Sequence, residues 1–247
     1  MRRIPVPLPG VTPGKVDARS ERWREHRKKV RAEIVDAAFA AIDRDGPQVS
    51  LREIAAEAGT AKPKIYRHFN DKADLFAAIG KRLRDMLVAA IFPTIDLATD
   101  PTREVVRRCV AEYVNLVEQH PNVLRFVLQG RFPEPAESTT RGLNEGREIT
   151  VAIAGMFNNE LSDLHLEPAS LDLAAAACFG SASTATDWWL GADPDSPPRM
   201  PTEKFVAHLT TIMLGTIQGI ADLLDIDLDP DLPLRSATPR NEPARHA

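Results

Sequence analysis

Apolar residues recur every three or four positions along most of the chain, a spacing that predicts α-helices rather than strands. The first such pattern covers residues 21–45, and Gly46 followed by Pro47 ends it. No stretch alternates convincingly between apolar and polar residues, so the sequence predicts an all-α protein. The apolar face of the first helix consists of Val30, Ile34, Val35, Ala37, Ala38, Phe39, Ala41 and Ile42.

Two short helices are expected next. Ser50 precedes Leu51, Arg52 and Glu53, the arrangement of a capping box in which the serine and the glutamate satisfy each other's backbone N–H groups. This helix ends at Gly59, where the turn requires a positive φ or leaves no room for a Cβ. The second short helix covers about residues 62–69.

A longer helix begins at Asp71, whose carboxylate caps it, and carries one apolar stripe. Beyond Pro93 proline and glycine separate the remaining helical patterns. Residues 1–20 hold four prolines and no periodicity, which predicts a disordered arm. The chain from Asp225 is polar and proline-rich, which predicts a frayed end, with residues 229–247 as a disordered tail. The later helices are expected at about 102–119, 121–130, 137–161, 169–190 and 202–224.

Charge is unevenly divided along the chain. Residues 1–86 hold 19 Lys and Arg against 12 Asp and Glu, whereas residues 87–247 hold 12 against 23, so the net charge of −4 hides a basic segment and an acidic one. Such asymmetry indicates a module for a polyanion attached to an acidic body. The basic segment concentrates positive charge around residues 62–72.

Other classes of site find little support. No apolar run reaches the roughly 18 residues of a membrane span, and no secretory signal opens the chain, so a cytoplasmic protein is expected. Cys109 and Cys178 lie in apolar helical patterns and are expected to be buried thiols. The acidic stretch at residues 225–231 lacks the glycine and the final glutamate of a calcium loop. No catalytic residue, metal site or cofactor is expected.

Two short helices joined at a glycine, after a helix that supplies the core, form a helix-turn-helix. Ile65 and Phe69 hold the second short helix to the core, so its other face presents basic residues to solvent. A helix of this kind fits the DNA major groove. Pro63 suits the first turn, where its missing N–H has no intrahelical partner, and is expected to leave Lys62 just ahead of the helix.

Residues 28–84 resemble the DNA-binding domain of the TetR family of bacterial transcriptional regulators. The resemblance rests on Asp45-Gly46, on residues 49–55 (V-S-L-R-E-I-A), on Ala58-Gly59, on residues 65–69 (I-Y-R-H-F) and on residues 71–75 (D-K-A-D-L). Two positions depart from the family's pattern: small or hydroxyl-bearing residues are usual where Ala61 stands, so a side-chain contact is lost there, and Pro63 replaces a commonly small residue. The rest of the chain resembles the family only in length and helix content.

The resemblance implies a role for each matching residue. The helix at about 62–69 becomes the recognition helix, Tyr66 and Lys72 become phosphate contacts, and Lys62 and Lys64 lie nearest the bases. For each of these residues the alternative is simple solvation or packing. For the basic arm from Arg19 to Arg31, solvation and binding in the DNA minor groove are both possible interpretations. The expected DNA-binding residues are Ser50, Arg52, Thr60, Lys62, Lys64, Tyr66, Arg67, His68 and Lys72.

The acidic body is expected to sense a ligand and to dimerise, because a palindromic operator needs two readers. The domains are therefore a helix-turn-helix domain at 21–88 and a helical ligand-binding and dimerisation domain at 89–228. Ordinary core packing is the alternative for every residue named. The dimer interface is expected at Phe205, Leu209, Ile212, Gly215, Thr216 and Gly219. The ligand-binding residues are expected to be Asn115, Phe126, Gln129, Phe132, Met156, Phe157, Phe179, Asp187 and Trp188.

The sequence thus predicts a homodimeric repressor that a small hydrophobic or amphipathic effector releases from a palindromic operator. An architectural or cell-division factor that binds DNA and a protein partner is the alternative on the same fold. An all-α enzyme with an incidental helix-turn-helix is a further alternative.

Overall fold

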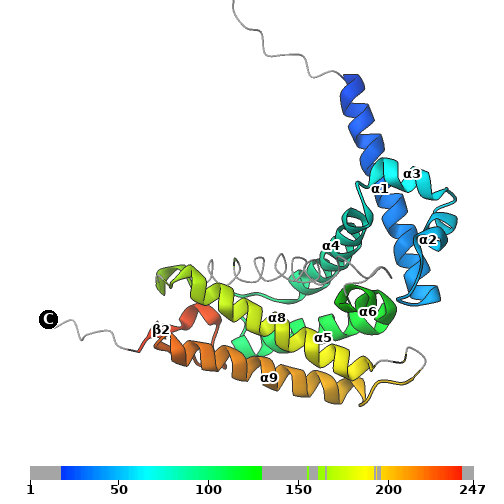
Figure 1. Cartoon of the computed structure of the whole chain (residues 1–247). Coiled ribbons are helices and arrows are strands. Elements are labelled where there is room, and N and C mark those ends of the chain that lie inside the picture. The colour runs from blue at the N-terminus through cyan, green and yellow to red at the C-terminus, as the bar shows by residue number, and fades with distance from the viewer. Residues whose placement is uncertain are drawn as a thin grey trace, which may run out of the picture.

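The computed structural model describes residues 18–129, 155, 161–164, 166–191, 193 and 196–240. These residues form α-helices with very little strand, which confirms the all-α prediction (Figure 1). The expected helix at 137–161 lies outside the described residues except for its two positions Gly155 and Leu161. The α-helices are α1 (Ala18–Asp45), α2 (Leu51–Glu57), α3 (Lys62–His68), α4 (Lys72–Ile91), α5 (Thr102–Gln119), α6 (Pro121–Gln129), α8 (Pro168–Leu190) and α9 (Thr202–Leu223).

The helix-turn-helix is built on α1. Its apolar face buries Ile34, Ala38 and Ile42 against α2, α3 and α4. Side chains of α2 and α3 reach the same core, with Ile54 fully buried and Ile65 only 1% exposed. Each burial of an aliphatic side chain contributes about 1.5–3 kcal/mol, so the helix-turn-helix rests on a substantial core.

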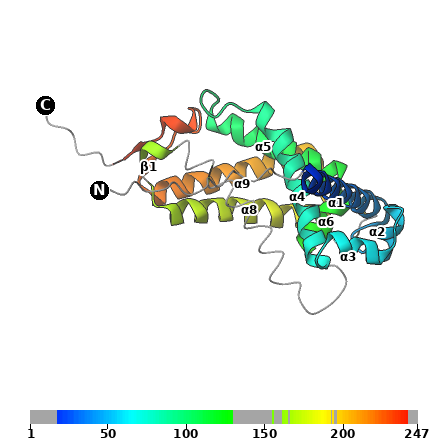
Figure 2. The same ribbon diagram turned by 90° about the horizontal axis from the view of Figure 1, so that it is seen from above.

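The body consists of α5, α8 and α9. Figures 1 and 2 show α8 and α9 side by side along their length, with α5 packed against α9. Trp189 is fully buried, stacks on Phe205 with ring centroids 4.4 Å apart, and donates its indole N–H to the carbonyl oxygen of Met200. Tyr113 donates to Thr186 across 3.0 Å, and burial raises the pKa of Tyr113 to about 12.

The short helix α6 joins the two parts. Its Val123 and Phe126 are fully buried in the core of the helix-turn-helix domain. His120 Nδ1 lies 2.6 Å from Asp43 Oδ2 at the end of α1. On the opposite side Arg125, only 4% exposed, donates to the carbonyl oxygen of Leu190 in α8. A movement of α6 therefore displaces atoms that contact both α1 and α8.

The expected boundary after residue 88 does not divide the packing, because α4 runs continuously to Ile91 and contacts α5 and α6. The expectation of a frayed end from Asp225 is also wrong as far as residue 240. Short strands β1 (Ile226–Asp227) and β2 (Thr238–Pro239) pair, and η3 (Leu234–Ser236) lies between them. Apolar side chains order this segment by burial, and the buried residues are Ile226, Leu228, Leu234 and Ala237.

A 3₁₀-helix, η1 (Phe92–Thr94), follows α4, and another, η2 (Ser162–Leu164), precedes α8. The C-terminal segment at 226–240 is also tied to the beginning of α5. The backbone N–H groups of Thr102 and Arg103 donate to the carbonyl oxygens of Leu232 and Pro230, at 2.9 and 2.8 Å. The last residues, 241–247, lie outside the described part of the chain.

Candidate nucleic-acid interface and effector cavity

The short helix α3 has one buried and one exposed face. Ile65 and the capping residue Phe69 are each 1% exposed and fix the helix to the core. The opposite face exposes Lys62, Lys64, Tyr66 and Arg67 to solvent. Three cations and a phenol therefore project from a helix of seven residues, the combination that suits phosphate oxygens and base edges.

Pro63 lies in the first turn of α3, as the sequence predicts. Lys62, however, is the first helical residue, and Ala61 with φ −111° and ψ 149° is the residue outside the helix. The prediction that Lys62 lies ahead of the helix is therefore wrong by one position. Proline biases the residue before it without preventing a helical first position. Lys62 Nζ lies 6.0 Å from the centroid of the Tyr66 ring, so both belong to one surface.

The turn between α2 and α3 follows the local signals in the sequence. Ser50 and Glu53 form the expected capping box: Glu53 N donates to Ser50 Oγ at 3.3 Å, and Ser50 N donates to Glu53 at 2.7 Å. Gly59 has φ +57°, a conformation that costs other residues about 1–2 kcal/mol. Thr60 N donates to the carbonyl oxygen of Ala55 across the turn, which completes the helix end.

Arg31 fixes α3 relative to α1 and α4. Its guanidinium pairs with both carboxylate oxygens of Asp74 at 2.7 and 3.1 Å and also donates to the carbonyl oxygen of His68. The same group lies 4.1 Å from the centroid of the Phe69 ring. The hydrogen bond from Arg31 is the main reason that the pKa of Asp74 lies below its usual range. The sequence places Arg31 only at the end of a basic arm and does not predict its contacts with Asp74 and His68.

His68 is half-buried, and its Nδ1 is buried without a hydrogen-bond partner. Burial, followed by the positive charges of Arg27 and Lys64, lowers its pKa. The imidazole is therefore neutral at neutral pH in the free protein. A cationic role in phosphate binding has no support from this position, although DNA would change the surrounding charge.

The remaining expected DNA-binding residues flank α3. Arg52 is exposed on α2, whereas Ser50 and Thr60 are half-buried at the ends of the two short helices. Lys72 begins α4 and is half-buried. Asp71 caps α4, as expected, because Asp74 N donates to its carboxylate at 2.8 Å.

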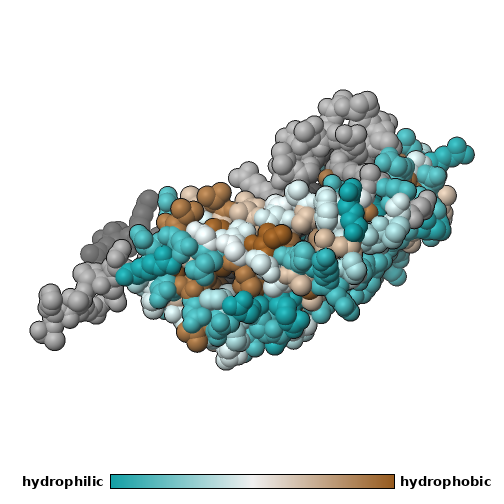
Figure 3. Space-filling view, turned by 90° about the horizontal axis from the view of Figure 1, so that it is seen from below, coloured by the Kyte–Doolittle hydropathy of each residue, from teal (hydrophilic) through white to brown (hydrophobic). Residues whose placement is uncertain are grey.

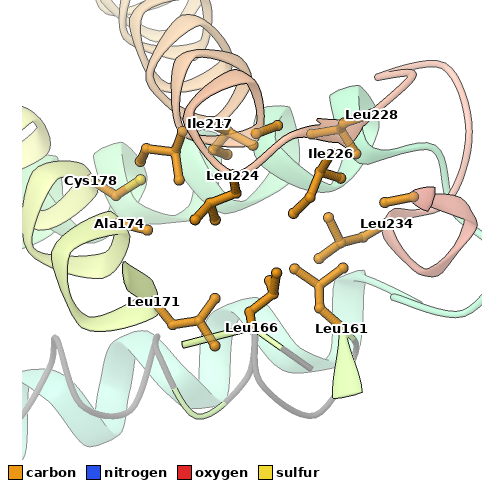
Figure 4. Close-up of a pocket in the computed structure, with 13 residues that line it drawn as sticks. Leu161, Leu166, Leu171, Ala174, Cys178, Ile217, Leu224, Ile226, Leu228 and Leu234 are labelled. Carbon is orange, nitrogen blue, oxygen red and sulfur yellow. The ribbon is translucent and has the colours of Figure 1, made fainter. Parts of the chain in front are cut away.

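A small apolar cavity lies at the other end of the molecule, between α8, α9 and the C-terminal segment (Figure 4). It encloses about 40 Å³, more than the 10–15 Å³ that one water requires but far less than a drug-sized ligand. Cys178 lines it, is not in a disulfide, and has a pKa raised to about 11 by burial. The lining residues are Leu161, Leu166, Leu171, Ala174, Cys178, Ile217, Ile220, Ala221, Leu224, Ile226, Leu228, Leu234 and Ala237.

Among the described residues, none of those expected to bind ligand lines this cavity, and the lining residues described are aliphatic apart from Cys178. Phe126 belongs to the core beneath α1 and α4, Phe179 is half-buried, and Asn115 is exposed and accepts a hydrogen bond from Gln119. Asp187 and Trp188 lie on the surface, where Trp188 meets Arg199. Phe132, Met156, Phe157 and the side chain of Gln129 lie outside the described part of the structure.

The expected dimer residues of α9 divide between two faces. Phe205 and Leu209 are 3% and 1% exposed because they fill the protomer's own core. Ile212, Gly215 and Gly219 are exposed, and Thr216 is half-buried. Figure 3 views the molecule from the side of α9, and hydrophobic and neutral residues run along the middle of this face. Large apolar side chains exposed on α8 and α9 include Leu173, Trp188, Ile212 and Leu223.

Further kinds of site are not indicated in the described ranges. No helix there has the length and apolar character that crossing a membrane requires. No three His, Cys, Asp or Glu side chains of those residues gather where a metal ion would bind. A basic exposed helix held on a three-helix core, followed by an all-α body, defines a helix-turn-helix DNA-binding regulator.

Comparison with known proteins gives the family. Residues 34–79 match the model of bacterial regulatory proteins of the tetR family. An uncharacterized HTH-type transcriptional regulator of Mycobacterium tuberculosis is 30% identical over 220 residues, which cover 87% of this chain and 88% of that protein. The chain belongs to the TetR family of transcriptional regulators, as its sequence pattern predicts.

Solved structures share the fold. A tetR-family transcriptional regulator from Streptomyces coelicolor aligns with a TM-score of 0.55 and 22% identity, over 79% of this chain and 83% of that one. The regulator FadR from Bacillus subtilis, in complex with stearoyl-CoA, aligns with a TM-score of 0.53 and 18% identity, over 76% and 98% of the two chains.

Proposed function

We propose that this protein is a homodimeric repressor that binds a palindromic operator and leaves it when a small hydrophobic molecule enters the body. The observation that carries the DNA-binding part is the exposed row of Lys62, Lys64, Tyr66 and Arg67 on a helix whose other face is buried. The proposal includes no catalytic step and no cofactor.

The surface of α9 supports the homodimer. Apolar and small residues rarely form one side of a long exposed helix unless a partner covers them. A C₂ dimer places two recognition helices on one face, and a palindromic operator matches that symmetry. Two copies of α8 and α9 would then pack as four helices, with Gly215 and Gly219 permitting close approach.

Loss of one charge from α3 tests the DNA-binding face. Lys64→Ala is expected to weaken operator binding about 5- to 150-fold for each half-site, since a lost base contact costs about 1–3 kcal/mol. Mapping the DNA bound in the genome first supplies the operator, and electrophoretic titration then compares the variants. Many dispersed sites and no defined operator would favour the architectural alternative.

Lys204→Ala is the matched control for Lys64→Ala. Lys204 is exposed at the start of α9, so its loss removes the same charge from the body and should leave operator affinity within about twofold, as expected for a distant surface charge under screening. Equal losses in both variants would contradict the assignment of α3 as the reading helix.

The aliphatic cavity beneath the C-terminal segment is our candidate for the effector site. It has the apolar character that suits a hydrocarbon group, but its 40 Å³ admit only part of a ligand. Binding would therefore favour a state in which α9 and the segment at 226–240 lie further apart. Through α8, Arg125 and α6, this displacement would reach α1 and change the spacing of the two recognition helices.

Filling the cavity tests this assignment. Ala174 is 6% exposed and lines the space, so Ala174→Leu should abolish the response to a series of straight-chain fatty acids while operator binding without them persists. Overpacking is expected to cost about 1–3 kcal/mol of stability, which thermal unfolding measures. Asn115→Ala is the control, because Asn115 was expected to bind ligand but lies exposed and away from the cavity. This variant should respond to the fatty acids as the unaltered protein does. A full response from Ala174→Leu would exclude the cavity as the effector site.

A further inference from the structure

The first part of α1 extends beyond the packed core, and we call residues 18–29 the α1 extension. Helix α1 begins at Ala18, and no side chain from Glu21 to Glu33 is buried; burial begins at Ile34. Every residue from Glu21 to Lys29 is exposed. At 1.5 Å per residue the segment projects about 20 Å from the domain, and Figure 1 shows it passing α3 as a single helix.

The two ion pairs at the inner end of the extension add little to its stability. Lys28 pairs with Glu25 at 3.1 Å and Lys29 with Glu33 at 4.0 Å, but exposed pairs of this kind contribute only about 0.2–0.5 kcal/mol each. A helix that is polar on all sides gains no stability from burial. Its composition therefore indicates a partner outside the protomer.

The charge of the extension identifies the kind of partner. Residues 18–31 hold seven Lys and Arg and two Glu, and the two acids occupy one side. Glu21 and Glu25 are four residues apart, so they share a face, whereas Trp23, Arg27 and Arg31 share another by the same spacing. Arg24 lies on the second face too, seven residues before Arg31. We call this second face the Trp23–Arg27 face.

The Trp23–Arg27 face continues toward the reading surface of α3. Arg31, on the same face, bonds the carbonyl oxygen of His68 and pairs with Asp74, which fixes the direction of α1 relative to α3. Arg27 and Lys64 come close enough to His68 for their charges to lower its pKa, after the larger effect of burial. Cations from two helices thus converge at one end of α3.

We propose that the Trp23–Arg27 face of the α1 extension binds the DNA backbone beside the major groove that α3 reads. Arg24 and Arg27 contact phosphates, and Trp23, a residue that is 68% exposed, lies against the sugars of the same strand. The inference rests on the proposed DNA-binding function. It adds a second contact that lengthens the bound site and strengthens binding without selecting bases.

The test compares two double variants of the full chain on the duplex bound in the cell. Arg24→Ala with Arg27→Ala should weaken binding at least tenfold at about 0.1 M salt. The slope of log affinity against log salt should become shallower by about 0.9 for each lost phosphate contact. Arg22→Ala with Lys29→Ala removes the same charge from the opposite side of the helix, since these two residues are seven apart, and should change affinity by less than threefold.

Two further measurements separate charge from structure. Arg24→Lys with Arg27→Lys should restore most of the affinity, and circular dichroism shows whether each variant retains its helix content. Trp23 fluorescence, taken as the difference between the unaltered protein and Trp23→Phe, should be quenched by DNA. The footprint should shorten at both outer ends in the alanine variant.

The possible results of these experiments distinguish failure of the inference from failure of the proposed function. An unchanged affinity and salt slope in the Arg24 and Arg27 variant, with the unaltered protein bound normally, would overturn the inference alone. Equal losses in the two double variants would also overturn it, because the effect would then come from overall charge. Failure of the unaltered protein to bind any duplex would instead overturn the proposed function on which the inference rests.

Discussion

Gly215→Leu combined with Gly219→Leu is expected to produce a folded monomer whose affinity for the operator is at least about 100-fold lower, because linked binding of two half-sites is worth that much. Both glycines lie exposed in α9, and a Cβ added at either position meets nothing within 4 Å in the protomer. The leucine side chains would project into the space that the second α9 occupies in the dimer.

The same substitutions should stabilise the protomer, which makes the result diagnostic. Glycine in a helix interior costs about 1 kcal/mol relative to alanine, and leucine is among the better helix formers. Sedimentation analysis should therefore report a monomer whose thermal unfolding temperature has not fallen. A lower unfolding temperature together with a retained dimer would contradict the assignment of this face.

Gly215→Ala with Gly219→Ala is the matched control for the leucine pair. It gives the helix a similar gain in propensity but adds only one carbon at each position, so a partly weakened dimer is expected. The half-site affinity should be the same for both variants, because the recognition helix at residues 62–68 is unchanged. A titration against full and half operators distinguishes loss of dimerisation from loss of DNA contact.

Local signals in the sequence predicted local structure well. The Ser50–Glu53 capping box and the positive φ of Gly59 depend on residues within a few positions of one another. Both can therefore be predicted from the sequence without knowledge of the tertiary fold. The buried positions Ile65 and Phe69 follow from helical periodicity in the same way. For this reason the sequence alone was sufficient to predict the all-α fold and the exposed face of α3.

The aliphatic cavity was not predictable in this way, because it forms only where the apolar faces of several elements far apart in the sequence meet. Phe126 has the same helical spacing whether it faces a ligand or a neighbouring helix, and packing alone places it against Phe76. The C-terminal segment did contain a signal: Ile226 and Leu228 alternate with aspartates, and both are buried. That period of two indicates a short strand with one covered face.

Phe126→Ala is expected to lower the free energy of unfolding by about 3–5 kcal/mol, the range for a buried phenylalanine that leaves a cavity. Its ring is fully buried, with its centroid 5.3 Å from that of Phe76, inside the core that α1, α4 and α6 share. Because this core holds the helix-turn-helix domain to the body, the variant should also lose operator affinity at temperatures where the unaltered protein binds.

Phe126→Leu provides the graded comparison for Phe126→Ala. It keeps most of the apolar volume and should cost less than half as much, whereas Asn115→Ala, at an exposed position, should change stability by no more than about 0.5 kcal/mol. Urea unfolding measures all three. If Phe126→Ala instead lost less than about 1 kcal/mol, well below the range for a buried aromatic ring, and no longer responded to the effector, Phe126 would line the ligand site. The effector site would then lie at Phe126. It would not be the cavity between α8, α9 and the C-terminal segment, because Phe126 does not line that cavity.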